Sequence, residues 1–343
     1  MSTQRAVVHK SKGIAEVSSN VPIPALRDEY IIVKTKAVAL NPTDWKAVDS
    51  RNSPGAIAGC DYSGIVEAVG KAVATPFKVG DRVAGFVHGA NVNNHEDGAF
   101  AEHVTAKGDL QIKLAENISF EAAATLGVGI TTVGQGLYQS LGLPFPPDQV
   151  QEPTQILIYG ASTATGTLAV QFAKLSGCEV IATASPHNFD LLRSLGADQV
   201  FDYREPGVGA KIRGVTHDKL RLAFDCISEF DSPAICSEAI SSKGGHYSSL
   251  LRVEKLSRDD VKNSLTMAYT ALGYQFSPAL PASQEDYEFA VKFWRAAEDL
   301  VNSGMIKAHP AKVMPGGLEG IIHGLQDLKV GRVSGAKLVY NID

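Results

Sequence analysis

The second half of the sequence repeats one short pattern, and this pattern limits the fold more than any other feature. Apolar runs of strand length recur at similar intervals, and they alternate with helical stretches such as "SFEAAATLGVGITTVGQGLYQSLG" (119–142) and "NFDLLRSLG". Alternation of strands with helices indicates a parallel sheet that is covered by helices on both faces. We therefore predict a doubly wound α/β domain from the runs "QILIY", "EVIATA", "ADQVFDY", "LRLAFDCI" and "GGHYSSLL".

The first part of the chain has a different texture. Up to about residue 120, β-rich runs such as "EYIIVKTKAVAL" and "SGIVEAVG" are separated by glycine-containing turns. Apolar and polar residues alternate in "YIIVKTKAV", which is typical of a strand with one buried face. These features predict an antiparallel, partly closed β-domain. A helix-like stretch, "SQEDYEFAVKFWRAAEDLVNSG", and a final strand, "GAKLVYNI", follow residue 265.

Composition excludes several classes of function. The formal net charge of −5 gives no reason to expect nucleic acid as a partner. No run approaches the ~20 apolar residues of a membrane span, and the first residues lack the apolar core of a signal peptide. The four cysteines form no C-x-x-C pair, which favours a reducing compartment. We expect a cytoplasmic protein without a membrane partner.

The stretch "YGASTATGTLAVQFAK", residues 159–174, stands where a dinucleotide-binding domain has its phosphate turn. The glycine pattern of that turn is G-x-G-x-x-G, and only Gly166 matches it when the pattern is read from Ala161. A helix N-terminus with nearby hydroxyls can nevertheless bind phosphate. The hydroxyls are those of Ser162, Thr163, Thr165 and Thr167. The alternative is an ordinary turn with a Ser/Thr helix cap.

The end of the next strand bears on the choice of cofactor. Domains that bind NAD usually have an acidic residue there, which accepts a hydrogen bond from the ribose 2′-hydroxyl. This sequence has Ser185, His187 and Asn188 instead, a neutral set that favours the 2′-phosphate of NADP. We interpret the nearby Asp190 as a first-turn acid of the following helix. Arg204 is either a further phosphate partner or an exposed surface residue.

Four motifs of the first part resemble the medium-chain dehydrogenase/reductase superfamily: "NPTDWK" (41–46), "GCDYSGIVEAVG" (59–70), "VGDRVAGF" (79–86) and "GAFAEHV" (98–104). The resemblance covers nearly the whole chain. It implies a GroES-like β-rich catalytic domain, residues 1–125 and 268–343, and a Rossmann NADPH-binding domain, residues 126–267.

Further strings are similar to the fungal trans-acting enoyl reductases, the stand-alone partners of reducing polyketide synthases such as the lovastatin synthase. They are "YGASTATGT", "IATASPHNFDL", "VFDYR", "LAFDCIS", "GGHYSSL" and "SGAKLV". General quinone reductases usually have G-A-x-G-G-V-G at the turn.

This resemblance implies a zinc-independent enoyl reductase of secondary metabolism. It would use NADPH to reduce the α,β-double bond of a carrier-protein-bound polyketide thioester, in trans to a reducing polyketide synthase or a synthase–peptide synthetase hybrid. Hydride is added at the β-carbon and a proton at the α-carbon, so the protein must position the reactants and stabilise the enolate oxygen. We expect a monomer rather than a dimer.

The resemblance also assigns residues to the site. Lys46 and Thr132 are the candidate catalytic residues, although a solvated lysine and an ordinary helix threonine are the alternatives. The expected cofactor contacts are Thr43, Asp44, Trp45, Lys46, Ser162, Thr163, Ala164, Thr165, Gly166, Thr167, Ser185, His187, Asn188, Tyr203, Leu250, Leu251, Ser334 and Gly335. The expected acyl groove is small or apolar, which suits a polyketide chain; it comprises Val133, Gly134, Gly136, Leu137, Ser140, Thr270, Ala271, Leu272, Gly273 and Tyr274.

A catalytic zinc site is not expected. Zinc-dependent members of the superfamily carry a cysteine where this chain has "NPTDWK", and Cys60 stands where they have a histidine. Cys60 and Asp61 would need a third protein ligand, and none is evident in the sequence. Two other functions stay open: a free-standing NADPH-dependent quinone or enone oxidoreductase, and a cofactor-binding protein without turnover.

Overall fold

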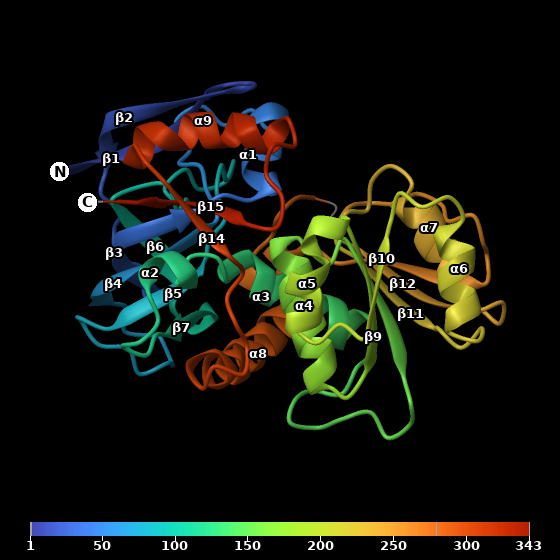
Figure 1. Ribbon diagram of the computed structural model, residues 1–343. Coiled ribbons are helices and arrows are strands. Elements are labelled where there is room, and N and C mark those ends of the chain that lie inside the picture. Colours follow the sequence, from blue (N-terminus) through green and yellow to red (C-terminus); the bar gives the residue numbers. More distant parts are fainter. Residues whose placement is uncertain (1, 279, 343) are drawn as a thin grey trace. The chain divides into compact units, whose positions relative to one another are not determined.

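The computed structural model describes residues 2–278 and 280–342, and this part of the chain forms two compact units (Figure 1). The first unit contains Met1–Val128 and Tyr287–Asp343, and the second contains Gly129–Asp286. No helix in the described ranges is at once long and apolar enough to span a bilayer.

The first unit is built on a seven-stranded sheet with the order β14-β15-β3-β4-β5-β7, in which β6 also pairs with β3. A separate antiparallel pair is formed by β1 and β2. The strands are β1 Thr3–Ser11, β2 Ile14–Pro22, β3 Tyr30–Ala39, β4 Asp61–Val69, β5 Arg82–Phe86, β6 His103–Lys107, β7 Gln111–Lys113, β14 Ala311–Met314 and β15 Lys337–Asn341. Residues 30–34 of β3 pair with β6 and residues 37–39 pair with β15, so this one strand joins two parts of a curled sheet.

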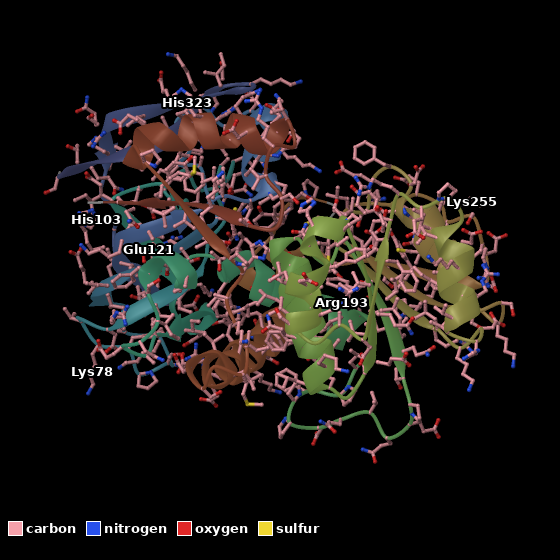
Figure 2. All side chains as sticks on the ribbon, in the orientation of Figure 1. Lys78, His103, Glu121, Arg193, Lys255 and His323 are labelled. Atoms are coloured by element: carbon pink, nitrogen blue, oxygen red, sulfur yellow. The ribbon has the colours of Figure 1, made fainter. Side chains whose placement is uncertain are left out.

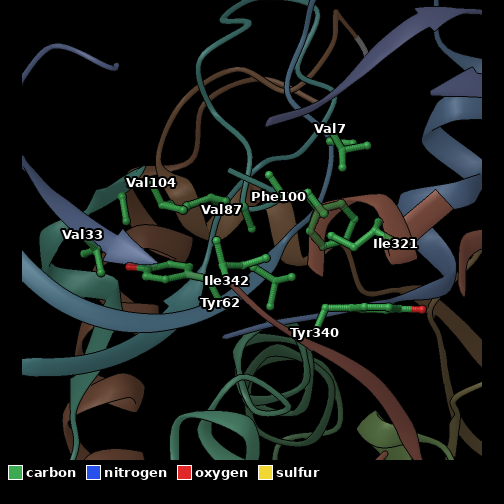
Figure 3. Close-up of a cluster of buried hydrophobic side chains, with 14 of the residues drawn as sticks. Val7, Val33, Tyr62, Val87, Phe100, Val104, Ile321, Tyr340 and Ile342 are labelled. Carbon is green, nitrogen blue, oxygen red and sulfur yellow. The ribbon is translucent and has the colours of Figure 1, made fainter. Parts of the chain in front are cut away.

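The core of the first unit lies between this sheet and the last helix (Figure 3). Val33 of β3, Tyr62 of β4 and Phe100 are fully buried there. Ile321 of α9 and Tyr340 of β15 join them from the end of the chain. The C-terminal strand β15 therefore contributes to the same core as the N-terminal strands. It also pairs directly with one of them, β3.

The helices of the first unit are α1 Pro42–Ser50, α2 Phe120–Ala123, α9 Gly317–Lys329 and α8 Gln284–Asn302, of which the first three residues belong to the second unit; a short 3₁₀ turn, η1, lies at Gly108–Leu110. The helix α8 shows why such a stretch is helical. Its buried residues, Ala290, Phe293, Trp294, Ala297 and Val301, recur at the spacing of one helix face. The Ser283 hydroxyl accepts a hydrogen bond from the Asp286 amide at 3.1 Å and caps its first turn.

The second unit is a six-stranded parallel sheet with the order β10-β9-β8-β11-β12-β13. This is the doubly wound order, so the predicted α/β domain is confirmed, as is the β-rich first part. The strands are β8 Gln155–Tyr159, β9 Glu179–Ala184, β10 Gln199–Asp202, β11 Leu222–Asp225, β12 Gly245–Ser249 and β13 Val261–Leu265. The helices are α4 Ala164–Leu175, α5 Phe189–Ser194, α6 Val208–Val215 and α7 Ser232–Ala239, with 3₁₀ turns η3 Pro186–Asn188 and η4 Ala268–Leu272.

The structure differs from the sequence prediction at two elements. The sixth strand, β13, was not predicted because it is an edge strand in which only Val261 is fully buried, so "VKNSL" contains no apolar run. The stretch 119–142, predicted as helical throughout, consists of α2, α3 (Gly127–Val133) and a π-helix, η2 (Gly134–Ser140).

The segment 268–286 lies in the second compact unit, whereas the sequence prediction grouped it with the first domain. Packing explains its place. Tyr269 stacks on Phe276 with ring centroids 4.9 Å apart, and Thr270 accepts a hydrogen bond from Gln135 of η2. Neither contact can be anticipated from a local pattern, because Gln135 and Thr270 are 135 residues apart.

Candidate functional site

The predicted cofactor residues of the second unit lie along one edge of its sheet. In parallel strands all carboxyl ends meet at the same edge, and ligands bind there, next to the point where the strand order reverses. That point lies between β8 and β11. The predicted residues follow β8, β9, β10 and β12, so the topology brings these four loops to a common edge.

The turn between β8 and α4 depends on two glycines. Gly160 adopts φ +70°, and a Cβ atom there would lie 2.6 Å from the Ile227 side chain. A Cβ atom on Gly166 would lie 2.4 Å from the Gly160 carbonyl oxygen. Close packing of the helix start against the strand therefore requires glycine, as it does at the third glycine of dinucleotide-binding turns. The sequence prediction found Gly166 and missed Gly160. The available signal was the position of Gly160 between the apolar strand "QILIY" and the Ser/Thr cap residues of the next helix.

The four hydroxyls of the turn have different roles. Thr163 is the N-cap of α4, and its hydroxyl accepts from the amide of the third helical residue at 2.9 Å. Thr167 is fully buried, and its hydroxyl donates to the Ala164 carbonyl oxygen at 3.2 Å. Ser162 and Thr165 are half-buried, and no described residue forms a hydrogen bond with either hydroxyl. The turn thus fits a phosphate through backbone amides and these two hydroxyls.

The corner after β9 contains Ser185, His187 and Asn188, of which His187 is exposed and Asn188 is buried. No carboxylate belongs to these positions. Asp190 lies in the first turn of α5, almost fully exposed, where it pairs with Arg193 at 3.1 Å (Figure 2 labels Arg193). The interpretation of Asp190 as a first-turn acid is therefore confirmed.

Tyr203 follows β10 directly and is 38% exposed. Its ring packs edge-to-face against Tyr159 with centroids 6.2 Å apart. The neighbouring Arg204 forms two hydrogen bonds to the Asp202 carboxylate, both of 2.9 Å, which hold the pKa of Asp202 below its ordinary value. The Arg204 guanidinium is thus paired with the carboxylate of the last residue of β10.

Asp225, the last residue of β11, organises this edge and was missed by the sequence analysis. Its Oδ1 accepts from the amides of Ile227 and Ser228, both at 2.9 Å. Its Oδ2 accepts from the hydroxyls of Ser232 at 2.6 Å and Tyr247 at 2.8 Å. Burial nevertheless raises the pKa of Asp225 above its ordinary value. The available signal was an aspartate at the end of an apolar strand, in "LAFDC".

The same network reaches the predicted residues after β12. Ser228 has φ +60°, a strained conformation for a residue with a side chain. Its hydroxyl donates to the Asp225 carbonyl oxygen at 2.9 Å and accepts from the Leu250 amide at 2.8 Å. Leu250 and Leu251 are half-buried. The Asp225 carboxylate therefore joins the loop after β11 to Tyr247 of β12, and the Ser228 hydroxyl joins that loop to the loop after β12.

The two predicted groove segments meet inside the second unit. Gln135 of η2 donates from Nε2 to the Thr270 hydroxyl at 3.0 Å, and this contact joins η2 to η4. Gly136 must be small, because a Cβ atom would lie 2.3 Å from the Phe224 ring. The buried predicted residues are Val133, Gly134, Gly136, Leu137, Ala271 and Leu272, while Ser140, Thr270, Gly273 and Tyr274 are half-buried. The pattern fits an apolar lining with few polar groups.

The predicted contacts of the first unit lie mainly at the start of α1. Thr43, Trp45 and Lys46 are half-buried and Asp44 is buried. Lys46 and Lys329 place their Nζ atoms 5.7 Å and 5.9 Å from the centroid of the Trp45 ring. Attraction to the ring face helps to hold both cations beside the first turn of the helix.

Asp44 is the most perturbed carboxyl group of this helix. Burial raises its pKa to about 7, and the charge of Asp61 adds to this effect. A hydrogen bond from the Asn41 amide at 2.7 Å, one from the Cys60 thiol and the charge of Lys337 favour the ionised form but do not outweigh burial.

Cys60 and Asp61, the two residues with metal-ligand chemistry in the first part, are engaged within the protein. Asp61 is fully buried and pairs with the buried Lys337. Its Oδ1 also accepts from the Val128 amide at 2.7 Å. Burial and Lys337 lower the pKa of the nearby His309 to about 3, which keeps that imidazole neutral. Among the described residues, no group of three or more His, Cys, Asp or Glu has the arrangement of a metal site.

The remaining predicted residues are distributed over the two units. Ser334 is exposed, and Gly335, with φ +63°, precedes β15 in the first unit. Thr132 is buried in α3, in the part that belongs to the second unit. The two candidate catalytic residues, Lys46 and Thr132, thus come from different units, and their roles stay predictions.

Family models match both units. The alcohol dehydrogenase GroES-like domain matches residues 27–116, and the zinc-binding dehydrogenase model matches residues 164–247. The trans-enoyl reductase ACTTS2 of Alternaria alternata is 59% identical over 344 residues, which cover 100% of both chains. The trans-enoyl reductase resD of Aspergillus sclerotiorum is 47% identical, over 98% of this chain and 100% of its own.

Solved structures share the fold. The CurK enoyl reductase superposes with a TM-score of 0.77 at 20% identity, covering 99% of both chains. An alcohol dehydrogenase superfamily protein from Novosphingobium aromaticivorans gives a TM-score of 0.81 at 22% identity, over 99% of this chain and 100% of its own. At this level of identity the likeness concerns architecture alone.

Proposed function

Because this chain belongs to the trans-enoyl reductases of the medium-chain dehydrogenase/reductase superfamily, we propose that it reduces the α,β-double bond of an enoyl thioester with NADPH. The thioester is carried by a reducing polyketide synthase, or a synthase–peptide synthetase hybrid, and the protein acts on it in trans. The observation that carries the proposal is the full-length 59% identity to a trans-enoyl reductase.

Membership of an oxidoreductase family implies a nicotinamide cofactor, and the second unit fits one. The turn before α4, with its two required glycines, would hold the pyrophosphate. The neutral corner of Ser185, His187 and Asn188 supports NADPH over NADH, because a carboxylate would repel the 2′-phosphate. When bound, the cofactor supplies the hydride that is added at the β-carbon.

The chain's own residues must position the thioester and stabilise the charge that develops on its carbonyl oxygen. Thr132 can donate a hydrogen bond from its hydroxyl, and Lys46 can contribute a positive charge. The small and apolar residues of η2 and η4 bind the acyl chain. They also exclude water, which would weaken the polar contacts to the thioester. The α-carbon of the resulting enolate then takes up a proton.

One experiment tests this function against its first alternative. The purified protein is mixed with NADPH and either a short enoyl thioester or a quinone, and the loss of reduced nicotinamide absorbance is followed. We expect a higher kcat/KM for the thioester. A preference for the quinone would identify a free-standing quinone or enone oxidoreductase, and no turnover with either would support a non-catalytic cofactor-binding protein.

The choice of cofactor and the role of Lys46 have separate tests. NADPH should bind at least tenfold tighter than NADH, a difference of about 1.4 kcal/mol. Equal affinities would contradict the interpretation of the corner after β9. Lys46→Ala should weaken NADPH binding or lower kcat, and unchanged kinetics would remove Lys46 from the site.

The assembly state is also part of the proposal. We propose a monomer in the cytoplasm that docks on a carrier domain of the synthase. Sedimentation of the purified protein measures its assembly state, and turnover of a carrier-bound enoyl substrate measures its action on the carrier domain. A stable dimer would contradict the first, and the absence of turnover on a carrier-bound substrate that is reduced as a free thioester would contradict the second.

A further inference from the structure

The π-helix η2 contains a buried polar group that the proposed chemistry has not used. Gln135 is 6% exposed, and its Oε1 has no hydrogen-bond partner among the described residues. Buried polar atoms in native proteins are nearly always paired, so an orphaned acceptor requires an explanation. Segments of π-helix are themselves frequent at functional sites. The two observations point to the same side chain.

The orientation of the Gln135 amide follows from the hydrogen bonds around it. The Thr270 hydroxyl donates its one proton to the Met267 carbonyl oxygen at 3.0 Å. It can therefore only accept from Gln135, which must present its NH₂ group at 3.0 Å. This leaves Oε1 as the unpaired atom, and an amide oxygen can only accept. The missing partner is thus a hydrogen-bond donor.

The residues next to Gln135 in the chain have no polar side chain that could bind such a donor. Its neighbours in the chain are glycines, Gly134 and Gly136, and the next residues on either side, Val133 and Leu137, are apolar and fully buried. A donor that enters this lining without meeting an acceptor would lose its hydrogen bonds to water. Gln135 therefore favours binding of a ligand that carries a hydrogen-bond donor over a ligand that carries none.

We propose that Gln135 is a recognition residue whose Oε1 accepts a hydrogen bond from an amide N–H of a bound molecule. The inference rests on the proposed function, which brings two such groups: the amides of the pantetheine arm that carries the thioester, and the carboxamide of the nicotinamide. Thr270 is a positioning residue, because its hydroxyl fixes which way the Gln135 amide faces.

The test compares Gln135→Met, which keeps the size of the side chain, with Gln139→Met. Gln139 lies in the same π-helix and donates to the Asp286 carboxylate at 3.3 Å, so this variant controls for the loss of an amide. The substrates are enoyl thioesters of pantetheine and of ethanethiol, which differ in the presence of amides. The dissociation constant for NADPH is measured separately by fluorescence, without turnover.

If the partner is the pantetheine arm, Gln135→Met should lower kcat/KM about tenfold for the pantetheine ester, through KM, and leave the ethanethiol ester unchanged. If the partner is the nicotinamide, the dissociation constant for NADPH should rise about tenfold and both esters should be affected equally. Either result supports an amide donor. A variant that changes neither quantity, or that changes them no more than Gln139→Met does, overturns the proposal.

Thermal unfolding separates recognition from a structural role. A merely structural Gln135 would lower the melting temperature of the ligand-free protein when it is lost. The proposal expects a loss no larger than that of Thr270→Val, because both variants break the Gln135–Thr270 hydrogen bond and Gln135→Met also removes an unpaired buried acceptor. Thr270→Val, which leaves Gln135 in place but frees its amide, should weaken the same affinity by a smaller factor. If the wild type reduces neither thioester, the proposed function fails, while the NADPH affinities still decide the role of Gln135.

Discussion

The buried carboxyl group of Asp44 should make the stability of the first unit depend on pH, and Asp44→Asn should remove that dependence. Burial raises the pKa of Asp44 from the ordinary 3.8 to about 7, the charge of Asp61 acts in the same direction, and the Asn41 amide, the Cys60 thiol and Lys337 act against them. Asn has nearly the same shape and is neutral at every pH. Comparison of the two proteins therefore isolates the cost of the charge.

The sign and size follow from proton linkage. Because the folded-state pKa of Asp44 lies above that of the unfolded chain, the folded protein holds an additional proton between about pH 4 and pH 7. Stability falls as pH rises through this window. One pKa unit corresponds to 1.36 kcal/mol, so the wild type should lose about 3 kcal/mol of unfolding free energy between about pH 5 and pH 8. The variant should not lose it.

Urea unfolding followed by tryptophan fluorescence measures this difference. The two tryptophans of the chain, Trp45 and Trp294, both belong to the first compact unit, so the signal reports on the unit that contains Asp44. Asp49→Asn is the matched control, since Asp49 lies on the same helix, half-buried and paired with Lys329 at 2.7 Å. A difference between wild type and Asp44→Asn that is equal at the two pH values would refute the reasoning.

Three further changes test other parts of the molecule. Gly166→Ala should raise the dissociation constant for NADPH about tenfold in a fluorescence titration, because the added Cβ would lie 2.4 Å from the Gly160 carbonyl oxygen. An unchanged affinity would mean that this turn does not hold the cofactor. Asp61→Asn should lower the free energy of unfolding in urea by about 3–5 kcal/mol, because it leaves the buried charge of Lys337 without its carboxylate. Adding Lys337→Met should restore part of this stability, and a double variant no more stable than Asp61→Asn would contradict the reasoning. Asp225→Asn should cost about 2 kcal/mol and speed hydrogen exchange in the loops after β11 and β12, whereas unaltered exchange would show that the carboxylate does not hold them.

The elements with a strong local pattern were predictable. The strands that contain "QILIY" and "EVIATA" and the amphipathic helix α8 lie where the sequence indicated, because apolar periodicity reflects burial directly. The edge strand β13 was missed because most of its residues are exposed. The π-helix was taken for ordinary helix, since the two share residue preferences and differ only in hydrogen-bond register.

The sequence by itself determined most of the strands and helices, the turn between β8 and α4 that we propose as the phosphate turn, and the family that the chain resembles. Each of these depends on residues close together in the chain. Only the tertiary structure decided which buried polar groups meet: Asp61 pairs with Lys337 across 276 residues, and Gln135 meets Thr270 across 135. A buried charge or amide must find a partner wherever the fold provides one, so its partner is a property of the packed molecule and leaves no pattern in its own segment.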